Sequence, residues 1–182
     1  MDSTTASPPR YFELDPATLD AEQRRIFEDI GRPRAGQVPA PFHIYVESPE
    51  LAATAQAVGA FCRYRTGLSP RLSETAILTT AAYWGAAYEF GVHAGEARKA
   101  GVPEAEIKAL EAGRRPDFDD PDAALVHDFA AAVYRHREVP DELFEAAVAR
   151  FGRRTVVELT GLLGYYSMLA IALRVFRVPP PA

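Results

Sequence analysis

The stretch from Glu74 to Gly101, ETAILTTAAYWGAAYEFGVHAGEARKAG, decides the fold of this chain. Alanine, leucine and aromatic residues fill it, and they recur with the period of a helix rather than with the alternation of a strand. Trp84-Gly85 interrupts this pattern. The stretch therefore predicts one helix that runs from Pro70 to about Ala82 and a second helix that runs from about Ala86 to Lys99.

Similar helical segments, separated by proline, glycine and capping residues, follow one another along the rest of the chain. From these boundaries we expect further helices at about 15–31, 49–65, 103–113, 121–137, 141–151 and 153–175. The three prolines and one glycine of residues 32–41 predict a loop. The expected fold class is all-α: a single-domain bundle of about eight helices over residues 15–178, preceded by a flexible N-terminal tail at residues 1–14.

Length and composition limit the classes of protein to consider. The 182 residues carry a formal net charge of -5 and no dense Lys/Arg block, so we expect no nucleic-acid partner. The longest uncharged apolar run, Gly161–Leu173, is shorter than the roughly 20 residues that span a bilayer. The N-terminus has no apolar signal segment and the chain has one cysteine, so we expect a cytoplasmic protein with no membrane partner.

Three proton-handling side chains, Glu74, Glu89 and His93, lie in an otherwise apolar stretch. Burial of a carboxylate or an imidazole is unfavourable unless the group is paired. Glu89 and His93 are four residues apart and share a helix face, and Glu74 reaches His93 if the chain turns sharply at Trp84-Gly85. Two interpretations stay open: His93 is a general acid or base oriented by a carboxylate, or a Glu–His pair is a buried structural contact between helices.

The expected partner of an acid–base group at this position is a small-molecule substrate. The backbone N–H groups at the start of the second helix are free to hold an oxyanion. We expect these side chains to bind substrate: Tyr88, Trp84, Arg71, Ala86 and Tyr165. Arg63 is an alternative to Arg71 for a substrate carboxylate. No second metal motif accompanies Glu89 and His93, so we expect no metal ion and no cofactor.

The other histidines and the cysteine have simpler interpretations. His127 and His136 lie beside charged residues on a predicted helix, and His43 follows Pro41-Phe42 in a predicted loop, so we expect structural or surface roles for all three. Cys62 has no second cysteine near it and lies on an amphipathic helix. This position favours a small buried hydrophobic residue over a reactive thiol.

Three segments carry a family resemblance: Leu68–Glu74 (LSPRLSE), Tyr88–His93 (YEFGVH) and Ala97–Ile107 (ARKAGVPEAEI). Together they resemble the carboxymuconolactone decarboxylase and alkylhydroperoxidase D-like superfamily, with good similarity over residues 68–110. The resemblance implies an all-helical fold with an antiparallel helix pair at its centre. It also implies a homo-oligomer, as a dimer, a trimer or a hexamer.

The peroxidase branch of this superfamily carries a Cys-x-x-Cys pair, and in this chain Ala86 and Glu89 occupy those two positions. Because thiol–disulfide chemistry needs a thiolate and a resolving thiol, the resemblance implies no peroxidase of that type. The decarboxylase branch lacks the pair and acts on a carboxylated unsaturated lactone from aromatic catabolism. We therefore expect a cofactor-free lyase that carries out proton transfer or decarboxylation on a small carboxylated lactone or enolisable acid, with a Glu–His pair. The alternatives are a non-catalytic oligomeric binding or scaffold protein and an isomerase or cyclase in a biosynthetic pathway.

Overall fold

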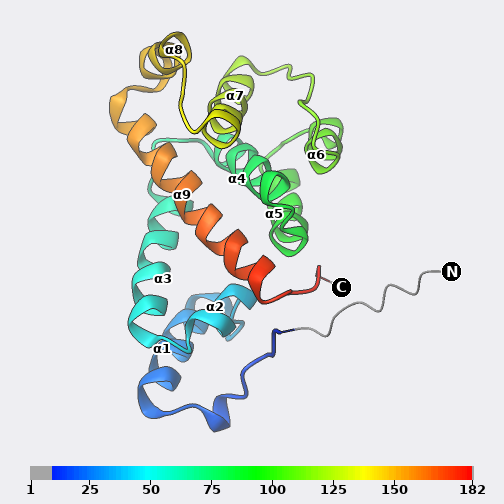
Figure 1. Cartoon of the computed structure of the whole chain (residues 1–182). Helices are drawn as coiled ribbons and strands as arrows, with labels where there is room; N and C mark the ends of the chain where they lie inside the picture. Colours follow the sequence, from blue (N-terminus) through cyan, green and yellow to red (C-terminus); the bar gives the residue numbers. More distant parts are fainter. Residues whose placement is uncertain (1–9, 182) are drawn as a thin grey trace, which may run out of the picture.

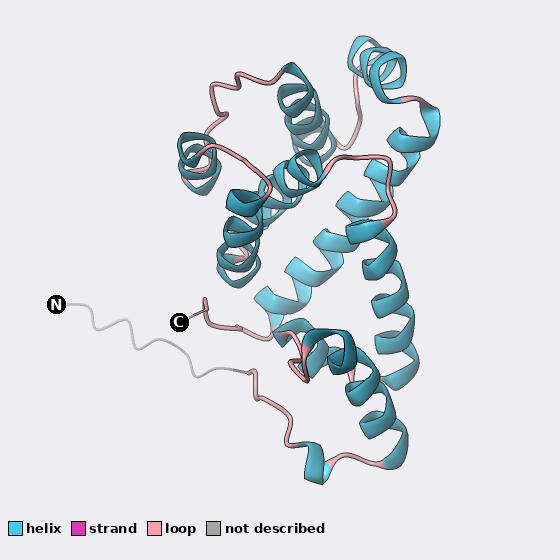
Figure 2. Cartoon of the chain, turned by 180° about the vertical axis from the view of Figure 1, so that it is seen from behind, coloured by secondary structure: helices cyan, strands magenta, loops and turns pink. Residues whose placement is uncertain are grey.

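The computed structural model describes residues 10–181, and in this range the regular structure is helical throughout, without a β-strand (Figures 1 and 2). This confirms the expected all-α, single-domain fold. The α-helices are α1 (Ala21–Gly31), α2 (Ala40–Tyr45), α3 (Pro49–Tyr64), α4 (Pro70–Trp84), α5 (Ala87–Lys99), α6 (Glu104–Glu111), α7 (Pro121–His136), α8 (Asp141–Phe151) and α9 (Arg153–Val175). Two short 3-10 helices are also present, at Pro16–Thr18 and Arg32–Arg34.

The sequence boundaries agree closely with those of the structure after residue 48. The observed bounds of α8 and α9 are those predicted, and Gly152, with a φ of +81°, separates the two helices. Pro70 stands in the first turn of α4, and the Ser69 hydroxyl accepts a hydrogen bond from the Leu72 amide as its cap. The boundaries therefore follow from local proline, glycine and capping chemistry.

The prediction of a loop over residues 32–41 is wrong at its end, because α2 begins at Ala40. Pro41 stands in the first turn of this helix, where a backbone N–H has no partner within the helix and its loss is tolerated. Ser48 is a second difference, since its side chain makes no cap hydrogen bond at the start of α3. Most of the expected tail, residues 1–9, lies outside the described residues, and its boundary stays a prediction.

Helix α4 is the centre of the fold, and it packs against α5, α7 and α9 (Figure 1). Its side chains are buried without interruption from Leu72 to Ala81. Gly85 ends α4 in the left-handed conformation, with a φ of +60°, which glycine adopts without a steric penalty. The chain then turns back, so α5 lies beside α4 and brings residues 74 and 93 to the same level.

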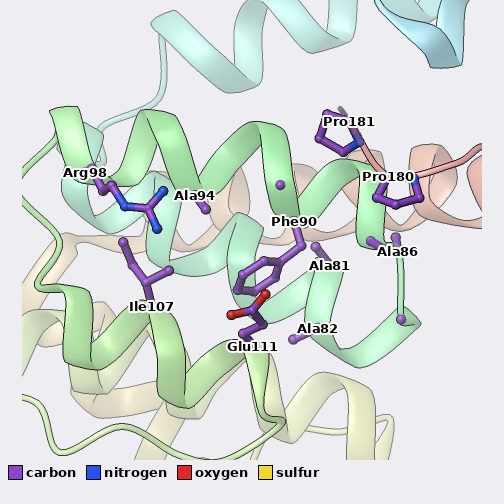
Figure 3. Close-up of a pocket in the computed structure, with 13 residues that line it drawn as sticks. Ala81, Ala82, Ala86, Phe90, Ala94, Arg98, Ile107, Glu111, Pro180 and Pro181 are labelled. Carbon is purple, nitrogen blue, oxygen red and sulfur yellow. The ribbon is translucent and has the colours of Figure 1, made fainter.

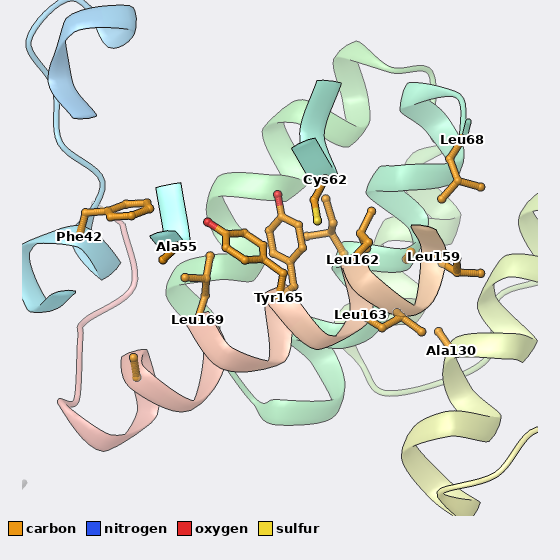
Figure 4. Close-up of a cluster of buried hydrophobic side chains, with 14 of the residues drawn as sticks. Phe42, Ala55, Cys62, Leu68, Ala130, Leu159, Leu162, Leu163, Tyr165 and Leu169 are labelled. Atoms are coloured by element: carbon orange, nitrogen blue, oxygen red, sulfur yellow. The ribbon is translucent and has the colours of Figure 1, made fainter. Parts of the chain in front are cut away.

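Helix α9 crosses the molecule against α4 and α3 (Figures 1 and 4). The helix has 23 residues and contains an 18-residue window with a mean hydropathy of 1.6, which also suits a membrane span, but 56% of that window is buried inside the folded chain. Tyr166, Leu159 and Leu162 are among the most deeply buried side chains of the structure. These contacts make α9 a core helix of the domain, and its Tyr165 and Tyr166 face the site described next.

Candidate active site

Glu74 and His93 meet between α4 and α5, as the turn at Gly85 allows. The Glu74 Oε2 atom lies 2.7 Å from the His93 Nδ1 atom, and both side chains are buried. The short distance is typical of a charge-assisted hydrogen bond. The interhelical Glu–His contact expected from the sequence is therefore present, and Glu74 is the carboxylate that faces Nδ1.

Glu89 occupies the other side of the imidazole ring. Its Oε1 atom lies 3.2 Å from the His93 Nε2 atom, one helical turn away on α5. Glu89 and His93 are each only 4% exposed, so water does not screen this contact. The sequence left open which carboxylate pairs with His93, and the structure shows that both do, one at each ring nitrogen.

The two carboxylates determine the charge of the imidazole. Burial alone lowers the pKa of His93, but the hydrogen bonds and negative charges of Glu74 and Glu89 together outweigh burial and raise this pKa to about 9. His93 is therefore an imidazolium at neutral pH, and both of its N–H groups donate to carboxylates. The site holds a proton that it can give to a substrate and later recover from solvent.

His93 and Glu89 border a cavity of about 110 Å³ that lies between α5, α9 and the C-terminal part of α3. Aromatic side chains form much of its wall, among them Tyr88, Tyr165 and Tyr166. The rings of His93 and Tyr166 pack edge to face, with their centroids 5.1 Å apart and their planes at 89°. A small molecule in this cavity would lie against the imidazole and among phenol groups.

Two guanidinium groups, of Arg34 and Arg63, also line this cavity. Arg34 already donates to the Ile30 carbonyl oxygen at 2.6 Å and to the Gln56 side chain. Arg63 makes longer contacts, 3.4 Å to Glu96 and 3.9 Å to Glu74, and its side chain is 27% exposed. Arg63 is therefore the cation in the wall that is better placed to meet a substrate carboxylate.

Other residues expected to bind substrate lie elsewhere. Arg71 does not line the His93 cavity, because its guanidinium contacts Glu106 at 3.3 Å and Asp120 at 3.7 Å. The Trp84 indole N–H donates to the Ser167 hydroxyl at 3.0 Å, which holds the ring away from the cavity wall. Of the five expected binding residues, the structure brings only Tyr88 and Tyr165 to the cavity that His93 borders.

Ala86, the fifth of these residues, lines a larger cavity of about 450 Å³ on another face of α5 (Figure 3). Phe90, Ala94 and Arg98 of α5 also face this cavity, and Pro180 and Pro181 form part of its rim. The amide groups at the start of α5 therefore border a space that does not contain His93. This larger cavity lacks the buried acid–base group, so we place the candidate site at the smaller one.

The remaining histidines and Cys62 have partners or positions that suit structural roles. The His43 Nδ1 atom accepts a hydrogen bond from the Leu14 amide at 2.9 Å, and His43 lies on α2 rather than in a loop. His127 contacts Asp128 at 2.9 Å. Cys62 is buried, burial raises the pKa of its thiol, and the thiol does not line the His93 cavity. Among the described residues, no group of three His, Cys, Asp or Glu side chains is arranged to hold a metal ion.

Gly59 and Arg34 are cavity residues that the sequence analysis did not single out. A β-carbon at Gly59 would overlap the Tyr165 hydroxyl, so only glycine admits this ring at its observed place. A glycine in the middle of a predicted helix is unfavourable for the helix and often marks a place where another group packs close to the backbone. This pattern could have identified Gly59 from the sequence. Arg34 had no such signal, because its place depends on the fold of the segment before α2.

Comparison with known proteins finds a family match over part of the chain and a shared fold over nearly all of it. Residues 49–132 match the carboxymuconolactone decarboxylase family, and this segment contains Glu74, Glu89 and His93. Among curated proteins, none matches the chain.

Three solved structures share the fold over nearly the whole chain. A peroxidase-related protein from Silicibacter sp. TM1040 has a TM-score of 0.78 at 18% identity, and the match covers 100% of this chain and 96% of that one. An alkylhydroperoxidase AhpD core protein from Ralstonia eutropha JMP134 has a TM-score of 0.77 at 19% identity, over 97% and 94% of the two chains. The debrominase Bmp8, solved in complex with 2,3,4-tribromopyrrole, has a TM-score of 0.71 at 15% identity, over 89% and 87%.

Because these identities are low, the structural likeness establishes the fold alone, and the family match applies to residues 49–132. The shared fold agrees with the helical architecture of the chain. The segment 49–132 of this chain therefore resembles the carboxymuconolactone decarboxylase family, and the sequence carries no Cys-x-x-Cys pair.

Proposed function

We propose that this protein is a cofactor-free lyase that decarboxylates, or transfers a proton on, a small carboxylated lactone or enolisable acid. The observation that carries the proposal is the His93 imidazole, which borders a cavity with Glu74 at one ring nitrogen and Glu89 at the other. A buried group whose pKa is shifted by named partners in a cavity is typical of a catalytic acid or base. That a protein of the same fold binds tribromopyrrole supports a small-molecule ligand.

His93 is the proposed acid, and its two hydrogen bonds have different roles. The shorter one, to Glu74, fixes the ring orientation, while the longer one, to Glu89, leaves the Nε2 proton easier to give up. In a decarboxylation, the bond to the carboxylate carbon breaks, carbon dioxide leaves, and the electron pair stays on the substrate as an enolate. His93 then gives its Nε2 proton to the enolate carbon and regains a proton from water.

A thiol peroxidase is a poor alternative for this chain. Ala86 and Glu89 stand at the two positions where the peroxidase branch has cysteines. The one cysteine, Cys62, is buried, and its raised pKa keeps it as a thiol. Proton transfer at His93 uses groups that this chain has, whereas thiol–disulfide exchange needs groups that it lacks.

We also propose that the enzyme is a cytoplasmic homo-oligomer, a dimer, trimer or hexamer. Leu51 and Val58 of α3 are 44% and 43% exposed and line an apolar groove of about 260 Å³, and Val157 of α9 is 62% exposed. Light scattering on purified protein measures the assembly. A mass equal to that of one chain at micromolar concentration would contradict this part of the proposal.

A substrate panel tests the catalytic proposal. We expect wild-type protein to release carbon dioxide from, or isomerise, at least one 3-oxo acid or carboxylated unsaturated lactone. His93→Gln should lose this turnover, and Glu74→Gln should keep a reduced turnover, while circular dichroism and light scattering show the same fold and assembly for both variants. Turnover that persists in folded His93→Gln would contradict the proposal. Variants that melt, together with a wild type inactive on every probe, would favour the structural contact between α4 and α5.

A further inference from the structure

Two buried tyrosine hydroxyls at the His93 cavity differ from the other tyrosines of the core. Tyr45 donates to the Met168 carbonyl oxygen at 3.0 Å, and the Tyr134 hydroxyl contacts Thr80 at 2.7 Å. Tyr165 and Tyr166 are just as buried, at 7% and 2% exposed, yet no group among the described residues hydrogen-bonds to either hydroxyl. A buried tyrosine hydroxyl normally has a partner, so these two are available to a ligand.

The two hydroxyls are not sealed in hydrocarbon. In the described part of the chain, the fully enclosed side-chain atoms without a partner are Arg71 Nε and Glu106 Oε2, and neither tyrosine is among them. Both tyrosines line the 110 Å³ cavity together with His93. Their unpartnered hydroxyls therefore border the same open space as the imidazole.

Rigid neighbours hold both rings in place. The Tyr165 and Tyr166 rings pack edge to face, with centroids 5.2 Å apart at 86°, and Tyr166 packs in the same way on His93. Tyr165 lies among buried side chains of α3 and α9, such as Ala55 and Leu169 (Figure 4). Its hydroxyl fits against the backbone of Gly59, where a β-carbon would leave no room. The hydroxyls are thus positioned before a ligand arrives, which oxyanion stabilisation requires.

Both phenols stay protonated at neutral pH and can donate. Burial is the largest cause that raises the pKa of Tyr165 and of Tyr166 above the ordinary value. The charge of Glu89 acts in the same direction on both groups, and that of Glu74 does so on Tyr166, while Arg63 opposes them there. The effect of Arg63 on the pKa of Tyr166 shows that the two groups lie close together. A hydroxyl donor, Tyr166, and a cation, Arg63, therefore line the cavity side by side.

The size of the cavity limits the ligand. A cavity of about 150 Å³ is the size that accommodates benzene in a protein core, and liquid water occupies about 30 Å³ per molecule. The His93 cavity, at about 110 Å³, is smaller than that. A six-membered ring or a lactone that carries a carboxylate exceeds this space, whereas a three- or four-carbon chain suits it.

We infer that Tyr165 and Tyr166 are the oxyanion-binding residues of this site and that its substrate is a short acyclic 3-oxo acid. This inference rests on the proposed function. The substrate carboxylate lies at Arg63, and the two hydroxyls donate to the 3-oxo oxygen. When the carbon–carboxylate bond breaks, the electron pair moves onto that oxygen, carbon dioxide leaves, and the phenols stabilise the enolate until His93 protonates its carbon.

The test compares Tyr166→Phe and Tyr165→Phe with wild type on 3-oxopropanoate, 3-oxobutanoate and carboxymuconolactone. Loss of one oxyanion donor should lower kcat by about 100-fold with little change in KM, because the donor acts mainly on the developing charge. The pH at which the rate falls should be the same as in wild type, since His93 is intact. Tyr134→Phe is the matched control, because it removes the hydroxyl of a half-buried tyrosine that has protein partners outside the cavity.

The outcomes separate this inference from the function on which it rests. The inference is supported if wild type turns over the oxo acids, Tyr166→Phe shows the expected loss of kcat, and Tyr134→Phe keeps the wild-type kcat. Turnover of the lactone in preference to the oxo acids would overturn the substrate class and leave His93 catalysis standing. Folded Tyr165→Phe and Tyr166→Phe with wild-type kcat would overturn the oxyanion role. A wild type inactive on every probe would overturn both the inference and the proposed function.

Discussion

The Tyr165 hydroxyl of α9 lies against the backbone of Gly59 of α3, in the space that a β-carbon at residue 59 would fill. This contact joins two helices at the wall of the His93 cavity, and it fixes where the hydroxyl points. A glycine in a helix interior is unfavourable by roughly 0.5–1 kcal/mol relative to alanine. Glycine at position 59 leaves the space that the Tyr165 ring occupies.

Gly59→Ala should therefore destabilise the protein, although alanine is the better helix former. The added methyl group overlaps the hydroxyl of a buried ring that packs against Tyr166, and such overpacking typically costs about 1–3 kcal/mol. Chemical denaturation measures the change, and turnover on the preferred substrate should fall because the hydroxyl is displaced.

Gly95→Ala on α5 is the matched control for this prediction. Apart from the adjoining residues and the backbone of its own helix, no atom lies within 4 Å of a β-carbon at Gly95, so this change should stabilise the helix by up to about 1 kcal/mol. If Gly59→Ala raised stability as Gly95→Ala does, with turnover unchanged, the close contact would have no energetic consequence.

The ionisation of His93 should depend on its two carboxylates. Nuclear magnetic resonance of isotope-labelled histidine should give a pKa of about 9 in wild type. Glu74→Gln removes a negative charge but leaves the imidazole buried, so the pKa should fall towards or below 6.5. An unchanged pKa in Glu74→Gln would show that the contact with Glu74 does not set the charge of the ring.

The same shift predicts a dependence of stability on pH. Because the folded-state pKa of His93 lies above 6.5, its contribution is fully present below pH 6.5 and is lost as the pH rises to about 9. The loss is on the order of 3 kcal/mol. Denaturant unfolding at pH 6.5 and pH 9.5 measures it, and His93→Gln should lack this fall. An equal fall in both proteins would assign it to other groups.

Arg71 should act on stability rather than on substrate binding. It contacts Glu106, which is 2% exposed and whose pKa burial raises. Arg71→Met leaves this carboxylate without its cation and should cost about 2 kcal/mol, with KM unchanged. The double variant Arg71→Met/Glu106→Met should recover much of the loss. A tenfold rise in KM without loss of stability would instead support a binding role.

The helices were predictable where their signals are local. Gly152 separates α8 from α9 and Gly85 ends α4, and each glycine takes a positive φ that other residues adopt at a steric cost. The turn at Gly85 also made the meeting of Glu74 and His93 predictable, because it reverses the chain between them. Helix α2 was missed because Pro41 resembles a loop residue, whereas proline in the first turn of a helix loses no hydrogen bond.

The cavity wall was only partly predictable, because it depends on partners far along the chain. Arg71 lies one turn from Glu74, but Glu106, 35 residues away, holds its guanidinium at α6. Trp84 is held by Ser167, 83 residues away. The sequence offered Tyr165 as a candidate for the site, but helical periodicity alone does not tell whether Tyr165 or its neighbour Tyr166 faces it. In the structure both do.

The most direct test of the central claim is the pH dependence of kcat/KM in wild type and in Glu74→Gln. If the imidazolium form of His93 is the acid, kcat/KM should fall as the pH rises through about 9 in wild type. The fall should move to lower pH in Glu74→Gln, because the imidazole then loses its proton more easily. A profile that stays level through pH 9, or that is the same in both proteins, would contradict the account.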